Sequence, residues 1–123
     1  MQIDTQLDRT MFAALRRQGA RGPWLHLLAQ VLRLAGERVE LLRHAERPWA
    51  SVTFSGTRHA IALRFRGAQA LEEGEAFIAA LPDHEFAIPR QLVADATIAA
   101  VDHVAGESPV LTVEAELLLL EDF

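Results

Sequence analysis

Hydrophobic residues recur at helical spacing in the first third of the chain. Residues 5–18 repeat apolar side chains at every third or fourth position, and the pattern stops at the glycine-containing segment 19–22. Residues 23–35 open with Pro23, are apolar on nearly every side and stop at Gly36, as expected for a helix with proline in its first turn and glycine beyond its last. The pattern predicts two helices, and the second must be buried by a sheet, another helix or a second subunit.

An alternation of apolar and polar residues, which is the period of a β-strand, begins near residue 37. The predicted strands are residues 38–45, 49–54 and 58–66. Residues 46–48 are predicted to form a turn, and Ser55-Gly56 is typical of a two-residue hairpin loop. That loop predicts a register in which the apolar faces agree, with Val52 opposite His59 and Ala50 opposite Ile61.

Helical spacing returns once and is followed by a long hairpin. Residues 69–81 predict a third helix, and residues 86–89 predict an extended segment that Pro89 keeps at an edge or in a loop. Residues 93–104 and 109–121 predict two terminal strands. Their register rests on three predicted pairs: Ile98 with Ala115, Ala96 with Leu117, and Ala100 with Val113.

Together these segments predict one α+β domain that spans residues 1–123. The element order α-α-β-β-β-α-β-β predicts an antiparallel sheet of about five strands with helices packed on one face. The apolar runs, such as residues 117–120, are far too short to span a membrane. The N-terminal residues lack the basic start and apolar stretch of a secretory signal, so we expect a cytoplasmic protein of bacterial origin.

The composition removes several kinds of chemistry, because the chain has twelve Arg but no Lys, Cys, Tyr or Asn. Without Lys there is no Schiff base and no Walker lysine. Without Cys there is no thiolate nucleophile, disulfide or iron–sulfur ligand. His, Asp, Glu, Ser, Thr and Arg remain to carry any chemistry, and we expect no cofactor.

The formal charge of −5 is unevenly distributed along the chain. Residues 1–71 carry eleven Arg and five acidic residues, a net charge of +6, whereas residues 72–123 carry one Arg and twelve acidic residues, a net charge of −11. Two explanations are open. Either the halves neutralise one another, within the fold or across a dimer, or the Arg-rich half faces a phosphate or a polyanion.

No catalytic or metal-binding set can be assembled from the sequence. The five histidines lack the spacing of a zinc-binding helix, so no metal site is predicted. Asp102-His103 and Ser108 have the residue types of a hydrolase, but neighbouring strand residues point to opposite faces. His59 falls on the apolar face of its predicted strand, which favours a buried neutral imidazole with one hydrogen bond over a ligand-binding role.

Three arginines, Arg58, Arg64 and Arg66, share the polar face of one predicted strand and are called the Arg row below. A guanidinium group binds phosphate or carboxylate through two parallel hydrogen bonds, so the Arg row, with His59 nearby, is the candidate ligand-binding site. Glu114 and Glu116 form an acidic row on the last strand, and we expect the two rows to face each other. The acidic pI and the lack of a nucleic-acid-binding motif argue against nucleic acid.

The second helix has more apolar surface than one sheet face should absorb. We therefore predict a homodimer formed through this helix or the last strand, with a possible further protein partner. The predicted interface residues are Trp24, Leu27, Leu28 and Val31. The sequence thus favours a non-enzymatic protein–protein interaction or oligomerisation domain. The alternative is a small-molecule or anion-binding domain, including a weakly marked enzyme, that uses the Arg row.

Overall fold

The computed structural model describes residues 23–121, so the first predicted helix, residues 5–18, lies outside the described residues. Two α-helices, α2 (Pro23–Ala35) and α3 (Ala68–Ala80), and a short 3-10 helix, η1 (Leu81–Asp83), are present in that range. The strands are β1 (Val39–Ala50), β2 (Ser55–Arg66), β3 (Gln91–Val104) and β4 (Val110–Glu121). Gly36, with a φ of 102°, ends α2 in the left-handed conformation that its position predicts.

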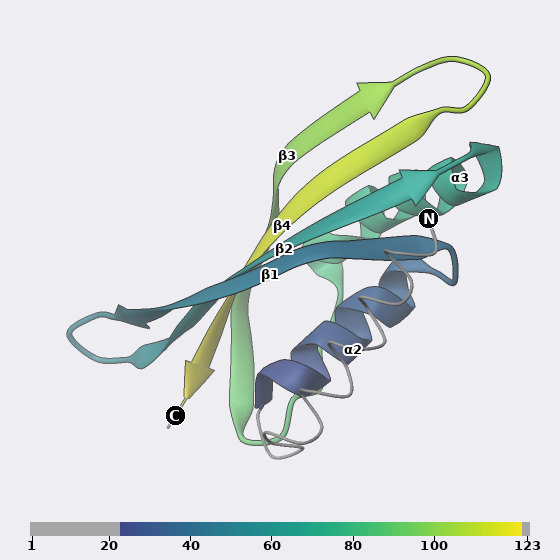
Figure 1. Ribbon diagram of the computed structural model, residues 1–123. Coiled ribbons are helices and arrows are strands. Elements are labelled where there is room, and N and C mark those ends of the chain that lie inside the picture. Colours follow the sequence, from purple (N-terminus) through teal and green to yellow (C-terminus); the bar gives the residue numbers. More distant parts are fainter. Residues whose placement is uncertain (1–22, 122–123) are drawn as a thin grey trace.

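The strands form one antiparallel sheet in the order β1-β2-β4-β3. Both α2 and α3 cover the same face of this sheet (Figure 1), so the predicted α+β class and the placement of the helices are correct. We call the covered side the helix face and the opposite side the far face. β4 pairs with a strand on each side, so the last strand has no open edge with which to pair a second copy.

The sheet has four strands in the described range rather than about five, because β1 runs through the predicted turn at 46–48 and residues 51–54 of the next predicted strand form a turn. Pro48 does not end β1 and lies opposite Thr57 in a continuous ladder. β1 is an edge strand, and a proline is tolerated at an edge because one side of the backbone needs no partner.

The β1–β2 turn lies at residues 51–54 rather than at Ser55-Gly56. The Ser51 hydroxyl oxygen accepts hydrogen bonds from the backbone N–H groups of Thr53 and Phe54, at 3.3 and 3.0 Å. A serine side chain that holds the next backbone amides in this way stabilises a turn. The shifted turn makes the predicted register wrong, since the structure pairs His59 with Glu46 and Ile61 with His44.

The terminal hairpin is predicted almost correctly. Ile98 lies opposite Ala115 and Ala96 lies opposite Leu117, as expected, but Ala100 lies opposite Glu114 rather than Val113. The register shifts by one residue between Ile98 and Ala100, which is the effect of a β-bulge in the edge strand.

A second irregularity, between Leu41 and Arg43, changes which residues of β1 face the helices. Before it, Leu41 lies opposite the buried Leu63, and after it His44 lies opposite the buried Ile61. Residues directly opposite each other in a ladder share a face. The bulge therefore turns His44 toward the helices and Arg43 toward the far face.

The core lies between the helix face and the two helices, and it includes Leu28 of α2, Phe77 of α3 and Leu117 of β4. Gln30 adds a polar tie from α2 to the loop before β3. Its amide nitrogen donates to the carbonyl oxygen of Ala87 at 2.6 Å, and its amide oxygen accepts from the Ala87 N–H at 3.1 Å. The segment 86–89 is therefore a loop held against α2 and not a strand.

Candidate functional site

The charged residues of the far face form rows that cross the strands. Basic residues come from β1 and β2, and acidic residues come from β4 and, at Glu40, from β1. The rows that matter for the site are Arg43-Ala62-Glu114, Ala45-Ala60-Glu116 and Arg47-Arg58-Leu118.

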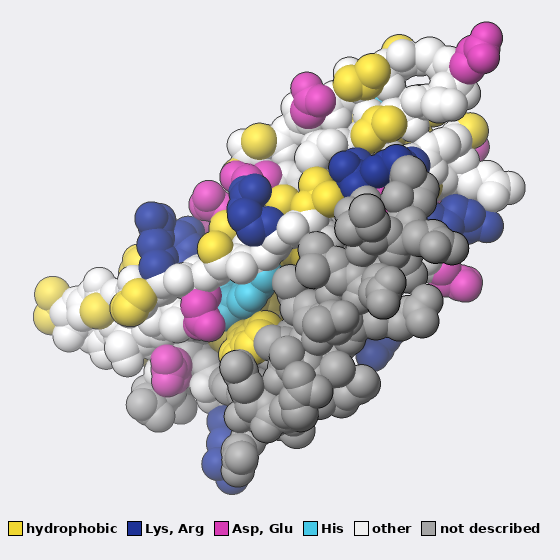
Figure 2. All heavy atoms as spheres, in the orientation of Figure 1, with side chains coloured by type: hydrophobic (Ala, Val, Ile, Leu, Met, Phe, Trp, Pro, Cys, Tyr) yellow, Lys and Arg dark blue, Asp and Glu magenta, His cyan; other side chains and the backbone are white. Residues whose placement is uncertain are grey.

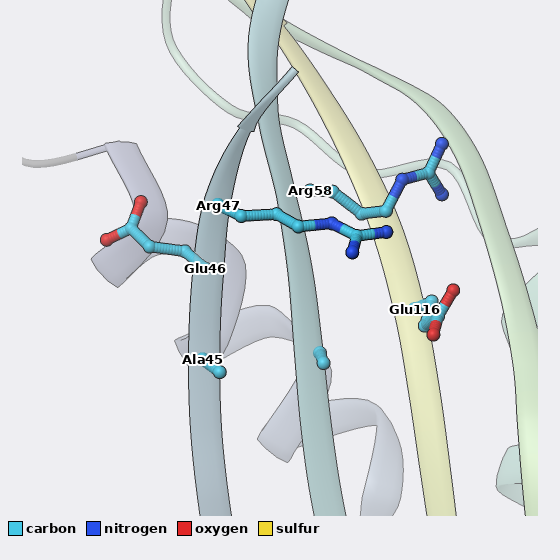
Figure 3. A pocket seen from close by; sticks show the side chains of 6 residues that line it. Ala45, Glu46, Arg47, Arg58 and Glu116 are labelled. Carbon is cyan, nitrogen blue, oxygen red and sulfur yellow. The ribbon is translucent and has the colours of Figure 1, made fainter.

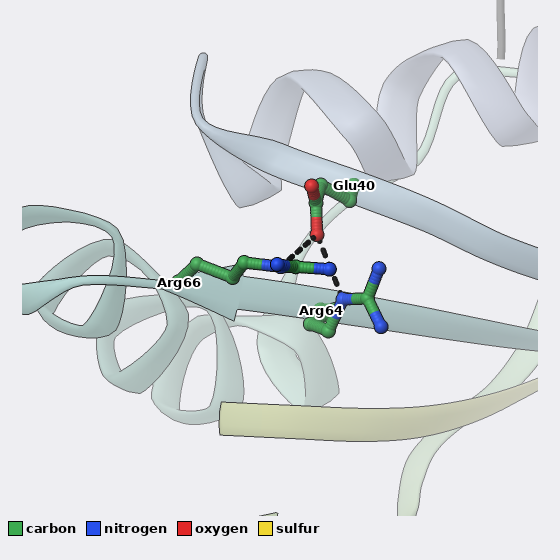
Figure 4. A network of polar contacts seen from close by, with 3 residues as sticks. All are labelled: Glu40, Arg64 and Arg66. Atoms are coloured by element: carbon green, nitrogen blue, oxygen red, sulfur yellow. Dashed lines mark hydrogen bonds and ion pairs between the residues drawn. The ribbon is translucent and has the colours of Figure 1, made fainter. Parts of the chain in front are cut away.

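Two members of the Arg row share one carboxylate from the neighbouring strand. The Nε atoms of Arg64 and Arg66 donate to Oε1 of Glu40, at 2.7 and 3.0 Å (Figure 4). Glu40 lies directly opposite Arg64 on β1. These two arginines therefore share a carboxylate from the basic half of the chain, and this carboxylate does not belong to the acidic row.

Glu114 of the acidic row is bound by an arginine that the sequence did not single out. Arg43 on β1 forms an ion pair with Glu114 on β4, although β2 lies between them. Ala62, which is only 4% exposed, occupies the middle position of that row. Because the alanine side chain is small, the arginine can extend across it. The basic and acidic rows thus share the far face as expected, but Arg43 makes the contact.

Arg58, the remaining member of the Arg row, lies directly opposite Arg47 of β1. Neither arginine has an ion pair with a carboxylate among the described residues. Figure 3 shows the Arg47 side chain crossing over β2 and the Arg58 side chain reaching over β4, so both guanidinium groups stand above the sheet. They border a shallow hollow, called the Arg hollow below, whose lining residues are Ala45, Glu46, Arg47, Arg58, Ala60 and Glu116.

His59 lies on the opposite side of the sheet from the Arg hollow, so the predicted site does not assemble as one unit. Its side chain is fully buried. Nδ1 of His59 lies 2.9 Å from Nε2 of His44, and Nε2 of His59 lies 2.9 Å from Oγ1 of Thr57. The imidazole is buried as predicted, but it has two polar partners rather than one.

An indole ring covers the histidine pair from α2. The rings of Trp24 and His44 stack with their centroids 4.9 Å apart and their planes at 6°. Burial lowers the pKa of His59 to about 4, and the neighbouring His44 contributes in the same direction. Burial also lowers the pKa of His44, and the negative charge of Glu46 offsets part of this effect by raising it. Both rings are therefore neutral near pH 7.

The other predicted interface residues of the second helix lie in the core. Leu27, Leu28 and Val31 are fully buried in the single chain, and Trp24 is partly buried against the core and stacked on His44. Most of the apolar surface that predicted a dimer through this helix is thus buried within the single chain. The homodimer stays a prediction, without this surface to support it.

The residues that resemble a hydrolase set do not converge. Asp102, His103 and Ser108 are all exposed around the β3–β4 turn. Within residues 23–121, no group of three or more His, Asp or Glu side chains is placed to hold a metal ion. Within the same range, no helix is long and apolar enough to cross a membrane.

Large apolar side chains are exposed on both hairpins. Val52 is fully exposed and Phe54 is 42% exposed at the tip of the β1–β2 hairpin, and β3 exposes Leu92, Val101 and Val104. This tip projects from the body of the sheet, at the left of Figures 1 and 2, and apolar side chains lie at its end. The predicted register places Val52 opposite His59, on the apolar face of a strand, and Phe54 falls on the same face by its alternation. Only the position of the turn exposes them.

No family model and no curated protein sequence matches the chain. The fold is similar to that of a chain from the virion of a native gene transfer agent (GTA) particle, with a TM-score of 0.50 and 14% sequence identity. The match covers 89% of this chain and 93% of that chain. At this identity the likeness shows a shared fold over nearly the whole of both chains.

Proposed function

We propose that this chain is a structural subunit that assembles with other protein subunits in a virion-type particle. The observation that carries the proposal is the exposed apolar tip of the β1–β2 hairpin, with Val52 and Phe54 at its end. These side chains contribute nothing to the core of the chain. A projecting apolar tip of this kind is typical of a surface that becomes buried against another protein.

The energy available at this tip is sufficient to matter for assembly. Burial of a valine or phenylalanine side chain contributes about 1.5–3 kcal/mol each, and aromatic residues are frequent among those that dominate binding at interfaces. Phe54 would supply such an anchor, and the turn held by Ser51 presents it in a defined position.

A sheet edge offers a second kind of contact. Among the strands of residues 23–121, β3 pairs with β4 alone, so its outer edge presents a row of backbone donors and acceptors. An open edge accepts a strand from another chain. Leu92, Val101 and Val104 are exposed along β3, which adds apolar surface to that edge.

The fold comparison supports the same function. The similar chain belongs to the virion of a gene transfer agent, and the match covers 93% of it. Its whole fold, and not a fragment, therefore corresponds to this one. The predicted interaction domain agrees with a subunit of this kind, and such a protein would reside in the particle as well as in the cytoplasm.

The direct test follows a tagged copy of the chain in cells of the organism that encodes it. Particles are purified on a density gradient and probed for the tag. We expect the tagged chain to sediment with the particles, and the variant Val52→Ser/Phe54→Ser to be depleted from them. The matched control is Ala79→Ser/Ala80→Ser, which introduces two serines at exposed positions of α3, away from both hairpins, and it should remain with the particles.

One result would overturn the proposal. If particles form in normal number when the gene is deleted, and the tagged chain is absent from the particle fractions, the chain is not a subunit.

A further inference from the structure

We infer that the Arg hollow binds a single carboxylate group presented by a neighbouring protein subunit. The inference rests on the proposed function only in naming another subunit as the source of the carboxylate. The Arg hollow itself is defined by Arg47 and Arg58, which border it from two adjacent strands (Figure 3).

The two arginines are placed in a way that the folded chain alone does not explain. Arg47 and Arg58 are directly opposite each other in the β1–β2 ladder, and like charges in that position destabilise a sheet. The other far-face arginines have carboxylate partners: Arg43 pairs with Glu114, and Arg64 and Arg66 pair with Glu40. This pair therefore carries an unfavourable charge contact that an external anion would relieve.

The shape of the site favours a small group. Ala45 and Ala60 lie opposite each other in the neighbouring row and line the Arg hollow, so space remains above the sheet beside the guanidinium groups. A guanidinium presents parallel N–H donors that match a carboxylate. Two guanidinium groups on adjacent strands can bind the two oxygen atoms of one carboxylate.

Glu116 limits the type of anion that fits. Its carboxylate lines the same hollow, and the ion pairs among the described residues do not include it. Glu46 also borders the hollow, but its carboxylate points away from the two guanidinium groups (Figure 3) and lies opposite His59 in the ladder. On the far face, two arginines against the one carboxylate of Glu116 therefore leave a surplus of one positive charge. A singly charged carboxylate neutralises that surplus. The phosphate chain of a nucleic acid would instead be repelled by Glu116 and Glu114 on the same face, and the overall charge of −5 opposes it further.

The first test measures binding to the isolated chain. The Arg Nε–H resonances are followed by NMR during titration with a short poly-glutamate peptide and, separately, with oligothymidylate at the same low ionic strength. We expect the peptide to shift the Arg47 and Arg58 resonances first. We also expect Arg47→Gln/Arg58→Gln to weaken its affinity about tenfold or more.

The matched control variant is Arg33→Gln/Arg90→Gln, which removes the same charge from two exposed sites outside the Arg hollow. It should retain most of the peptide affinity. Equal weakening by both variants would show that only net charge matters and would overturn the inference. Tighter binding of oligothymidylate than of the peptide would overturn it in favour of nucleic acid.

A second test separates a binding site from a structural ion pair. We expect Arg58→Gln to leave the melting temperature unchanged or raise it, because the like-charge contact with Arg47 is relieved. The contrary outcome has two parts: Arg58→Gln lowers the melting temperature, and it no longer does so in a chain that also carries Glu116→Gln. Arg58 would then be the structural partner of Glu116, and the inference would fail.

These experiments use the isolated chain, so their failure is distinct from failure of the particle assay. A chain that binds poly-glutamate through Arg47 and Arg58 but never enters particles would overturn the proposed function and leave the carboxylate site in place. Conversely, the chain could be found in particles while its Arg47→Gln/Arg58→Gln variant binds the peptide normally. That result would overturn the carboxylate site and leave the proposed function in place.

Discussion

At the scale of single residues, the pair of His44 and His59 shows how burial restricts chemistry. Each neutral imidazole has one donor and one acceptor nitrogen, so one proton can serve the 2.9 Å contact between the rings. Both rings cannot be protonated together, because two N–H donors would then meet across that contact. The contact between the two rings therefore needs at least one neutral histidine, and the low pKa of His59, about 4, agrees with this.

The first prediction concerns stability against acid. Burial lowers the pKa of His59 in the folded chain from its ordinary value of 6.5 to about 4. The unfolded state, in which histidine keeps its ordinary pKa, therefore binds the proton more readily. The contribution of His59 is complete above pH 6.5 and is lost as the pH falls from 6.5 to 4. We expect the free energy of unfolding to decrease by at most about 3 kcal/mol over this window, as measured by urea denaturation at a series of pH values.

The variant His59→Gln should reduce the pH dependence, since glutamine can hydrogen-bond but does not titrate. His103→Gln, at an exposed position of β3, is the control and should keep the wild-type dependence. An unchanged slope in His59→Gln would mean that other groups cause the loss of stability in acid.

A second residue-scale prediction concerns Gly56, near the start of β2. A Cβ atom at this position would lie 2.1 Å from the backbone carbonyl oxygen of Leu119, a distance that requires the two central strands to move apart. We expect Gly56→Ala to lower the free energy of unfolding by about 2 kcal/mol or more. The exposed neighbour Ser55 provides the control, and Ser55→Ala should change stability by less than about 0.5 kcal/mol.

At the scale of elements, the pairing of β1 with β2 determines which charges meet. The bulge between Leu41 and Arg43 reverses the facing of β1, so that Glu40 and Arg43 both reach the far face from positions three apart. In a regular strand, residues three apart point to opposite faces. The bulge therefore allows one edge strand to supply both the anion for Arg64 and the cation for Glu114.

The third prediction is a double-mutant cycle on the ion pair that spans β2. Arg43→Gln, Glu114→Gln and the double variant should give a coupling energy of about 0.2–1 kcal/mol, because both side chains are partly solvent-exposed. The coupling should weaken at high salt, where exposed charges are screened. The same cycle with Arg64 and Glu116 should give a coupling near zero, because Arg64 binds the carboxylate of Glu40 on the other neighbouring strand.

A coupling between Arg64 and Glu116 as large as that between Arg43 and Glu114 would restore the original expectation that the Arg row faces the acidic row. The free energies of unfolding of all variants, measured by urea denaturation at two salt concentrations, decide between the two arrangements.

At the scale of the whole molecule, the two faces of the sheet have separate roles. The helix face carries the core and the buried histidines, and the far face carries the charge network and the Arg hollow. The hairpins extend beyond the region that the helices cover (Figure 1), and their apolar side chains are exposed. Contacts with other proteins at the hairpin tips and the far face would therefore leave the core intact.

The fourth prediction follows from this separation. Val52→Ser/Phe54→Ser should leave the melting temperature within a few degrees of the wild-type value, because neither side chain is buried. The same variant should reduce any concentration-dependent association measured by light scattering, because apolar surface drives such association. A large drop in the melting temperature would show that the tip packs inside the chain, contrary to its exposure.

The periodicity of the sequence was sufficient to predict the α+β class, the helices at 23–35 and 69–81, the terminal hairpin and the burial of His59. These features depend on local patterns. Helical or strand spacing is read from neighbouring residues, and a strand residue on the apolar side of a long alternation is buried whatever its exact partner. The wrong partner for His59 therefore did not change the conclusion that it is buried.

The tertiary structure decided which residues meet. Pro48 and the Ser51 turn show why: a proline ends a strand in the middle of a sheet but not at an edge, and the sequence does not state that β1 is an edge. A turn displaced from Ser55-Gly56 to residues 51–54 then changed every pair in the β1–β2 ladder.

The same reason separates the predicted site from the observed one. Arg58, Arg64 and Arg66 were identified from sequence because they alternate along one strand. Arg47 was not, because it falls in the segment assigned to a turn. Whether an arginine is neutralised depends on strand order, register and bulges, which arise from contacts between distant segments. The sequence by itself therefore determined the local elements and the polar face of β2, whereas long-range strand pairing decided that Arg47 and Arg58 stand together without a carboxylate among the described residues.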